Sequence, residues 1–550
     1  MCTTLKKSGA NIWIKQLMNR RRFLQYGIAA AGLATVWSSC NHSRTVKGRI
    51  TGASSSIGHL LREYQFSKPV SSIQKKVVII GSGISALSAA RYLQQQGINN
   101  MLVLELEDHI GGNAAHSTNT ISSFPLGAHY IPIPNNNLEE YLQFLQTAGV
   151  ITSFTAEGLP VYNEAFLCFD PEERLYINGH WQEGLIPQYG VADDDRKQIE
   201  RFVEQMHVFR MAKGTDGKDA FAIPVQWSSK DPSFVQLDAL TMKAWMLQQN
   251  YTSEYLHWYV NYCTRDDFGT AYDRCSAWAG IHYFAGRKGK ALNAEYSDVL
   301  TWPEGNGFLV KQLSMHLDPF IKTGALVSKV TMDNNALKIE YLDVKTKTVH
   351  EIITEHCIMA VPQFVGARLL NDKQRAKTAR EHLHYAPWMV ANIVTDVLEE
   401  RSGQPLCWDN VIYESASLGY VDATHQLLQQ HIPQKNLTYY LPLTQDLPAE
   451  ERKRAHAKSH QQWVQLILDD LKKIHPNLQQ AVKEINITLW GHAMAQPLPG
   501  FIHGSVRTQL AASLNNRLHF AHTDLAGISI FEEGFYQGLE AAKKIIQHGV

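Results

Sequence analysis

The sequence predicts an α/β protein, and three observations support that prediction. A β-branched run at 75–80 leads directly into a glycine-rich turn and then into a segment with helical periodicity. A second short apolar run, 101–104, ends at an acidic residue. Near the C-terminus, a strand-like segment, an acid and a glycine-containing helix follow one another. Buried strands that alternate with helices indicate a parallel sheet covered by helices.

Composition excludes several classes of protein. The chain has 550 residues, 44% of them hydrophobic and 19% charged, which is typical of a globular protein with several domains. Its formal net charge is zero, so no basic excess favours a nucleic-acid partner. The seven cysteines form no CxxC pair, and we expect no metal site. A disulfide between Cys263 and Cys275 and two separate buried thiols both remain open.

The first forty residues are expected to be an export signal. Arg20-Arg21-Arg22-Phe23-Leu24 precedes an apolar run, 26–37, that is too short to span a membrane. The paired arginines resemble a twin-arginine signal, which implies the twin-arginine translocase as a partner. The residues before Cys40 resemble a lipoprotein box, although Trp37 stands where Leu is usual, so a lipid anchor stays open. An uncleaved amphipathic helix is the alternative.

From this signal we expect the protein in the periplasm or cell envelope of a bacterium. Residues 41–72 follow with few periodic apolar positions and a run of serines. We interpret them as a linker between the signal and the first strand.

The first βαβ unit carries a dinucleotide-binding pattern. Gly81 permits the tight turn after the strand, Gly83 lets a pyrophosphate approach the backbone, and Ala86 allows close helix–strand packing. The N–H groups at the helix start, at Ile84 and Ser85, favour a diphosphate. Glu105 stands about 20 residues further on, where it would accept hydrogen bonds from ribose hydroxyls. The pattern therefore predicts a Rossmann-type domain.

The stretch after Glu105 resembles a flavoprotein signature. In the flavin-containing amine-oxidase family a Gly-Gly pair follows the acid by about six residues, as Gly111-Gly112 does here after Leu106. The family usually has Arg where Asn113 stands. Phe124 to Tyr130 resembles the family's stretch of small residues beside the flavin ring, which includes Gly127, Ala128 and His129 here. The resemblance implies FAD as the cofactor.

The C-terminal segment resembles the second FAD motif of the same family. The resemblance places Asp524 at the diphosphate–ribityl part of FAD, although His522 replaces the usual Gly. It places the start of the last helix near Gly534 and Phe535, where N–H groups would face the flavin. Segments 302–308, 327–330 and 357–362 also resemble segments of this family. The resemblance places 327–330 beside the adenine of FAD. The expected cofactor-binding residues are Gly81, Gly83, Ile84, Ser85, Ala86, Glu105, Leu106, Gly111, Gly112, Asn113, Gly127, Ala128, His129, Val330, Asp524, Glu533, Gly534 and Phe535.

The matching segments imply a discontinuous FAD-binding domain. We expect its parts at 73–139, 296–369 and 486–550. Residues 140–295 and 370–485 would then form an α+β substrate domain. The aromatic stretch 255–283 fits either a pocket wall or a helical core.

Candidate catalytic residues come from the resemblance alone. They are His129, Trp490 and His492, which would lie near the flavin. The amine oxidases often place a Lys near the flavin, but spacing assigns neither this Lys nor an aromatic cage here. No Ser-His-Asp spacing stands out in the sequence.

Together these features predict an exported FAD-dependent oxidoreductase whose flavin takes a hydride from a small molecule. The resemblance favours an amine as substrate, with O2 or a periplasmic or membrane carrier as electron acceptor. The alternatives are a phytoene-desaturase-like dehydrogenase, a flavin-dependent isomerase or mutase, and a non-catalytic FAD-binding protein.

Overall fold

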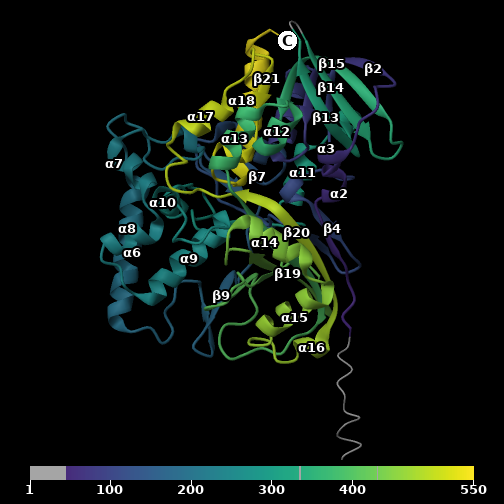
Figure 1. The fold of residues 1–550 in the computed structure, drawn as a ribbon. Helices are drawn as coiled ribbons and strands as arrows, with labels where there is room; N and C mark the ends of the chain where they lie inside the picture. Colours follow the sequence, from purple (N-terminus) through teal and green to yellow (C-terminus); the bar gives the residue numbers. More distant parts are fainter. Residues whose placement is uncertain (1–44, 334–335, 430–431, 550) are drawn as a thin grey trace, which may run out of the picture. The chain divides into compact units, whose positions relative to one another are not determined.

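The computed structural model describes residues 45–333, 336–429 and 432–549 (Figure 1). The chain divides into two units at Val46, and all that follows concerns residues 47–550. The predicted export signal and Cys40 lie outside the described residues. Within the described ranges, no helix is both long enough and apolar enough to cross a membrane.

One sheet contains the dinucleotide-binding pattern. Its strand order is β12-β3-β2-β15-β14-β13, and β21 pairs with β15 beyond the end of β14. The strands are β2 (Ser72–Ile80), β3 (Met101–Leu104), β12 (Ile321–Lys322), β13 (Ala325–Met332), β14 (Leu337–Asp343), β15 (Val349–Met359) and β21 (Leu518–Phe520). The pairs β2–β3, β2–β15, β3–β12 and β15–β21 are parallel. The predicted α/β fold is confirmed, and strands from three distant segments meet in this sheet.

Two helices pack together against this sheet, α4 (Ile84–Gln95) and α18 (Phe531–Gln547). Ser88 Oγ donates to the carbonyl oxygen of Phe535 at 2.8 Å. A Cβ at Gly538 would lie 1.9 Å from the Ser85 carbonyl oxygen, so only glycine allows this close approach. The packing holds the N-terminus of α4 at the end of β2.

The second sheet has the order β1-β20-β16-β19-β18-β17-β9-β10. Its strands are β1 (Ile50–Gly52), β9 (Glu173–Ile177), β10 (His180–Glu183), β16 (Tyr385–Asp396), β17 (Asp409–Ile412), β18 (Tyr420–Asp422), β19 (Gln434–Pro442) and β20 (Val482–Ala495). The prediction that the last FAD-binding part begins at 486 differs from this topology. Residues 486–495 continue β20, which pairs along most of its length with β16.

The expected linker also differs from the structure. Residues 50–63 contain β1 and two short helices, α2 (Ser55–Gly58) and α3 (Leu60–Glu63). Strand β1 pairs in parallel with β20, so this segment is part of the second sheet. The segment has many polar side chains and little periodicity, so the sequence did not predict a strand of only three residues.

A helical cluster has its own core. Its main helices are α6 (Asp193–Met211), α8 (Met242–Gln248), α9 (Glu254–Phe268) and α10 (Ala277–Ala285). Leu256 and Trp278 are fully buried in this core, so the helical-core alternative holds for that part of the aromatic stretch. Cys263 and Cys275 are buried free thiols.

Further elements complete the described chain. The strands are β4 (His116–Thr118), β5 (Ser123–Pro125), β6 (Tyr130–Pro132), β7 (Ile151–Phe154), β8 (Pro160–Tyr162) and β11 (Val299–Thr301). The helices include α5 (Glu139–Thr147), α7 (Pro232–Val235), α11 (Gly307–Leu313), α12 (Gln363–Leu369), α13 (Lys373–His382), α14 (Pro448–Ala457), α15 (His460–Leu471), α16 (Leu478–Ala481) and α17 (Ser505–Ala511). Helices α14 and α15 both contact β20, and β6 pairs with β11.

Candidate active site

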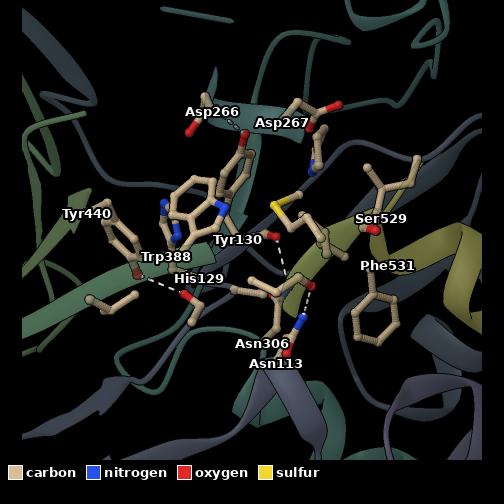
Figure 2. Close-up of a pocket in the computed structure, with 18 of the residues that line it drawn as sticks. Asn113, His129, Tyr130, Asp266, Asp267, Asn306, Trp388, Tyr440, Ser529 and Phe531 are labelled. Atoms are coloured by element: carbon tan, nitrogen blue, oxygen red, sulfur yellow. Dashed lines mark hydrogen bonds between the residues drawn. The ribbon is translucent and has the colours of Figure 1, made fainter. Parts of the chain in front are cut away.

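A cavity of about 160 Å³ lies where the end of α9, the start of α18 and three strands of the second sheet meet. Those strands are β16, β19 and β20, and the residues around β6 complete the wall. Figure 2 shows the aromatic and carboxylate side chains of this cavity. Of the expected site residues, Asn113, Gly127, Ala128, His129 and Trp490 line it.

The small residues at one end of the cavity allow two backbone segments to pack closely. A Cβ at Gly127 would lie 2.3 Å from the carbonyl oxygen of Asn113. That same oxygen accepts a hydrogen bond from the N–H of Ala128 at 2.9 Å. Asn113 Nδ2 in turn donates to the Ala493 carbonyl oxygen. These contacts fix the loop before β6 against the end of β20.

The glycines of the dinucleotide pattern form an open cradle. A Cβ added to Gly83 would meet no atom within 4 Å, whereas one on Gly112 would lie 3.3 Å from the Gly83 Cα. Gly81 has φ +99°, and its Cβ would lie 2.5 Å from the Ala360 carbonyl oxygen. No side chain caps the N-terminus of α4, so its N–H groups stay available to an anion.

A buried carboxylate lies beside this cradle. Glu105 accepts hydrogen bonds from Ser82 Oγ at 2.6 Å and from the N–H of Glu107 at 2.9 Å. Burial raises its pKa above the ordinary value. Glu105 lines a second cavity of about 100 Å³, and Trp490 lines both cavities. An open glycine cradle, an uncapped helix start and a carboxylate at a cavity suit a dinucleotide such as FAD.

Several expected cofactor-binding residues line neither cavity, among them Val330, Asp524, Leu106 and Gly111. Val330 belongs to β13 and is buried in the core of the first sheet. Asp524 is fully buried and accepts hydrogen bonds from Tyr385 Oη at 2.7 Å and from the Gln363 N–H at 2.8 Å. Leu106 and Gly111 also lie outside both linings, where they contact apolar side chains. No ligand contact of these residues follows from their placement.

The last helix starts earlier than expected. It begins at Phe531 rather than near Gly534. Gly534 lies within the helix, where it packs against Ile84 of α4. Phe535 packs in the same core, and the Glu533 carboxylate accepts the Val225 N–H at 2.5 Å. The residues of this region that line the cavity are Ser529, Ile530, Phe531 and Glu532.

The three catalytic candidates have different surroundings. His129 lines the cavity with its ring stacked on Tyr440 at 4.4 Å, and burial lowers its pKa to about 3, so the imidazole is neutral. Trp490 Nε1 donates to the Leu126 carbonyl oxygen at 2.6 Å. His492 lies outside both linings, with its ring 4.7 Å from that of Phe364.

Sequence reasoning missed two aspartates that face the cavity. Asp266 and Asp267 occupy the last turn of α9 (Figure 2). Burial raises the pKa of Asp266 to about 7, helped by the negative charge of Asp267. Burial raises the pKa of Asp267 to about 6, partly offset by Arg287. Two acids at a helix C-terminus oppose the helix dipole, and that pattern could have identified them.

Aromatic rings and one ion pair complete the lining. Tyr130 Oη lies 3.5 Å from Asp266 Oδ2, and Trp388 and Tyr440 stand on the strands beside it. Arg287 forms an ion pair with Glu532 at the start of α18. Among the residues described as lining this cavity, Arg287 is the one cation and no Lys occurs. Three carboxyl groups and one cation therefore line the cavity, so its net charge is negative when the acids are ionised, and its walls are aromatic.

Fold and site together define a protein that holds a dinucleotide cofactor beside a separate substrate cavity. The chain belongs to the family described as flavin-containing amine oxidoreductases, whose profile matches residues 84–546. The predicted family and the predicted cofactor, FAD, are thereby confirmed. A stretch of 68 residues is 37% identical to polyamine oxidase 1 of Zea mays. It covers 12% of this chain and 13% of that relative.

Solved structures share the fold at low identity. A putrescine oxidase double mutant superposes with a TM-score of 0.65 at 14% identity, covering 86% of this chain and all of that one. A fatty acid isomerase from P. acnes, described as producing CLA, gives 0.59 at 14% identity over 86% and 99% of the two chains. Such identities establish a common fold, while the chemistry rests on the site.

Proposed function

We propose that the protein is an FAD-dependent oxidoreductase that oxidises a cationic amine held by Asp266 and Asp267. The observation that carries the proposal is the pair of carboxyl groups at an aromatic cavity whose other end is the cofactor loop. Carboxylates and aromatic faces both attract an ammonium group, and both act more strongly where water is scarce.

The charges of the cavity decide between substrate classes. Arg287 forms its ion pair with Glu532 and only partly offsets Asp267, so the acids outnumber the one cation among the lining residues. A fatty acid would place its carboxylate against this negative charge, and the two would repel each other. An apolar polyene would leave the charged carboxylates buried without a partner, which is unfavourable. A protonated amine neutralises this charge. The amine is thus favoured over the isomerase and desaturase alternatives.

The side chains have separate tasks in this scheme. Bound FAD supplies the hydride acceptor. Tyr130, Trp388 and Tyr440 exclude water and orient the carbon next to the nitrogen. The substrate amine must lose a proton before it can give up a hydride, and Asp266 Oδ2 is suited to accept it because its pKa is about 7. His129 stays neutral and positions Tyr440 through the stacked rings.

Two further acids, Asp409 and Glu173, lie outside the lining of the cavity and add to the negative charge near Asp266. The Asp409 carboxyl has its pKa raised by burial and by the like charges of Glu173 and Asp266. Glu173 pairs in register with Asp409 across β9 and β17. Two of the similar proteins are named polyamine oxidase and putrescine oxidase, and both names refer to amines with more than one nitrogen. We propose that diamines and polyamines bind more tightly than monoamines of equal length.

The test is the Asp266→Asn variant assayed with putrescine. The amide keeps the shape but removes the charge, so KM should rise about tenfold, as expected for one lost charge-assisted contact. The flavin content should stay that of the wild type. Asp273→Asn, at an exposed aspartate just beyond α9, serves as the control and should leave KM unchanged. An unchanged KM in Asp266→Asn would remove the basis of the amine proposal.

We also propose that the protein is exported through the twin-arginine route. Support comes from Arg20 and Arg21 before Phe23 and Leu24. Replacing both arginines by lysine should leave the protein in the cytoplasmic fraction of the expressing bacterium. Periplasmic recovery of that double variant would contradict this proposal.

A further inference from the structure

A segment ahead of the dinucleotide fold lies over the ribose end of the FAD site. We call residues 47–66 the N-terminal strap. The carbonyl oxygens of Lys47 and Arg49 accept the N–H groups of Ile485 and Ile487, each at 2.9 Å. Figure 1 shows this segment in purple, leading to α2 and α3. The strap therefore begins as an edge strand on β20.

Close backbone contact fixes the strap at this edge. Gly52 has φ +155°, and a Cβ there would lie 2.3 Å from the Leu489 carbonyl oxygen. Thr51 Oγ1 donates to the Ile487 carbonyl oxygen at 3.2 Å. Beyond β1, apolar side chains of the strap pack on the first sheet in a small cluster with Leu326, Leu342 and Val349; they are Ile57, Leu60, Leu61 and Phe66. The strap is thus anchored on both sheets.

Between these anchors, Ser54 holds a carboxylate of the cofactor site. Its N–H donates to Glu107 Oε1 at 2.8 Å, and its Oγ donates to Glu107 Oε2 at 2.6 Å. The N–H of Glu107 donates to Glu105 Oε1. Ser54 is therefore linked through two hydrogen-bonded steps to the carboxylate expected at the ribose.

The same strap forms one wall of the second cavity. Thr51, Gly52 and Ala53 line it together with Glu105 and Gly112. Trp490 lines both this cavity and the substrate cavity. A ligand that occupies the ribose end is enclosed by the strap on one side and by the dinucleotide fold on the other.

We infer that the strap is a clamp that retains FAD. Ser54 is a positioning residue: it orients Glu107, which orients Glu105, and it closes the ribose end of the cavity. Dissociation of FAD then requires the strap to leave β20 or Glu107. This inference rests on the FAD site and is independent of the amine substrate, because its test measures retention of flavin and needs no turnover.

The first test compares FAD release from full-length Ser54→Ala and wild-type protein. Release is followed by the rise in flavin fluorescence after dilution. The variant loses the Oγ hydrogen bond to the Glu107 carboxylate and keeps the backbone one, and loss of one hydrogen bond to a charged group should speed release about tenfold. Ser56→Ala, at an exposed serine of the same helix α2, is the matched control and should release FAD at the wild-type rate. Equal rates in Ser54→Ala and wild type would overturn the inference.

A second test uses only the wild-type protein, so it does not depend on whether the variant folds. Backbone hydrogen exchange of wild-type protein is measured with FAD bound and after FAD is removed. Slower exchange at residues 50–54 in the FAD-bound form is expected, because FAD holds the strap closed. Exchange at 50–54 that is the same in both forms would overturn it, whatever substrate the enzyme takes.

Discussion

At the scale of single residues, the cofactor end was more predictable than the substrate end. Gly83 and Glu105 belong to a pattern in which each residue type has one physical purpose, so their sequence spacing locates them. Asp266 and Asp267 line a cavity whose walls come from segments far apart in the chain. Periodicity within one segment does not reveal such a neighbourhood. His492 shows the converse, since the resemblance suggested it and its ring lies outside both cavities.

Glu105 provides a prediction for cofactor binding. Glu105→Ala removes a carboxylate expected to accept the ribose hydroxyls, so FAD affinity should fall roughly 100-fold, as expected for two lost charged hydrogen bonds. The measurement is FAD affinity by fluorescence titration of the stripped protein. Glu204→Ala, at an exposed site on α6, is the control. Wild-type affinity in Glu105→Ala, with unchanged circular dichroism, would contradict the ribose assignment.

The raised pKa values of the two aspartates predict a pH dependence. Asp266 and Asp267 are protonated below their pKa values of about 7 and about 6 and ionised above them. A cationic amine binds the ionised form, so its KM should fall as the pH rises from about 5 to about 8. Steady-state kinetics across this range provide the measurement. A KM that rises with pH in that range would have the wrong sign for this account.

At the scale of elements, local patterns identified β2, α4 and β3 but misplaced the ends of others. The last helix begins at Phe531, because its glycines serve packing rather than the helix start. Strand β20 continues to Ala495 because its long partner β16 supplies the pairing. Strand β1 escaped prediction, since three residues at a sheet edge carry little periodicity. In each instance a tertiary contact determines the boundary.

Packing between α4 and α18 gives a prediction at this scale. Gly538→Ala would place a methyl group 1.9 Å from the Ser85 carbonyl oxygen, so the helices must separate. The expected loss of stability is about 1–3 kcal/mol, as for other overpacked sites. Thermal unfolding with FAD bound measures it. Gly58→Ala is the control, because its nearest atom would lie at 3.8 Å; equal Tm values for the two variants would refute the packing argument.

At the scale of the whole chain, three distant segments build one cofactor sheet, and the second sheet supplies strands to the substrate cavity. The sequence predicted the cofactor sheet because its motifs recur in a fixed order. It could not predict the substrate cavity, which depends on how α9 meets β16, β19 and β20. The family match extends over both parts, from residue 84 to residue 546. The proposed amine substrate therefore rests on the cavity of this chain and not on the family match.

The most direct test of the central claim is anaerobic titration of the FAD-loaded protein, followed by its flavin absorbance. The panel consists of putrescine, a monoamine of equal length and an unsaturated fatty acid. We predict that both amines bleach the flavin, putrescine at the lower concentration, and that the fatty acid leaves the spectrum of oxidised flavin intact. Bleaching by the fatty acid alone, or by none of the three, would contradict a cavity built to hold a cationic amine.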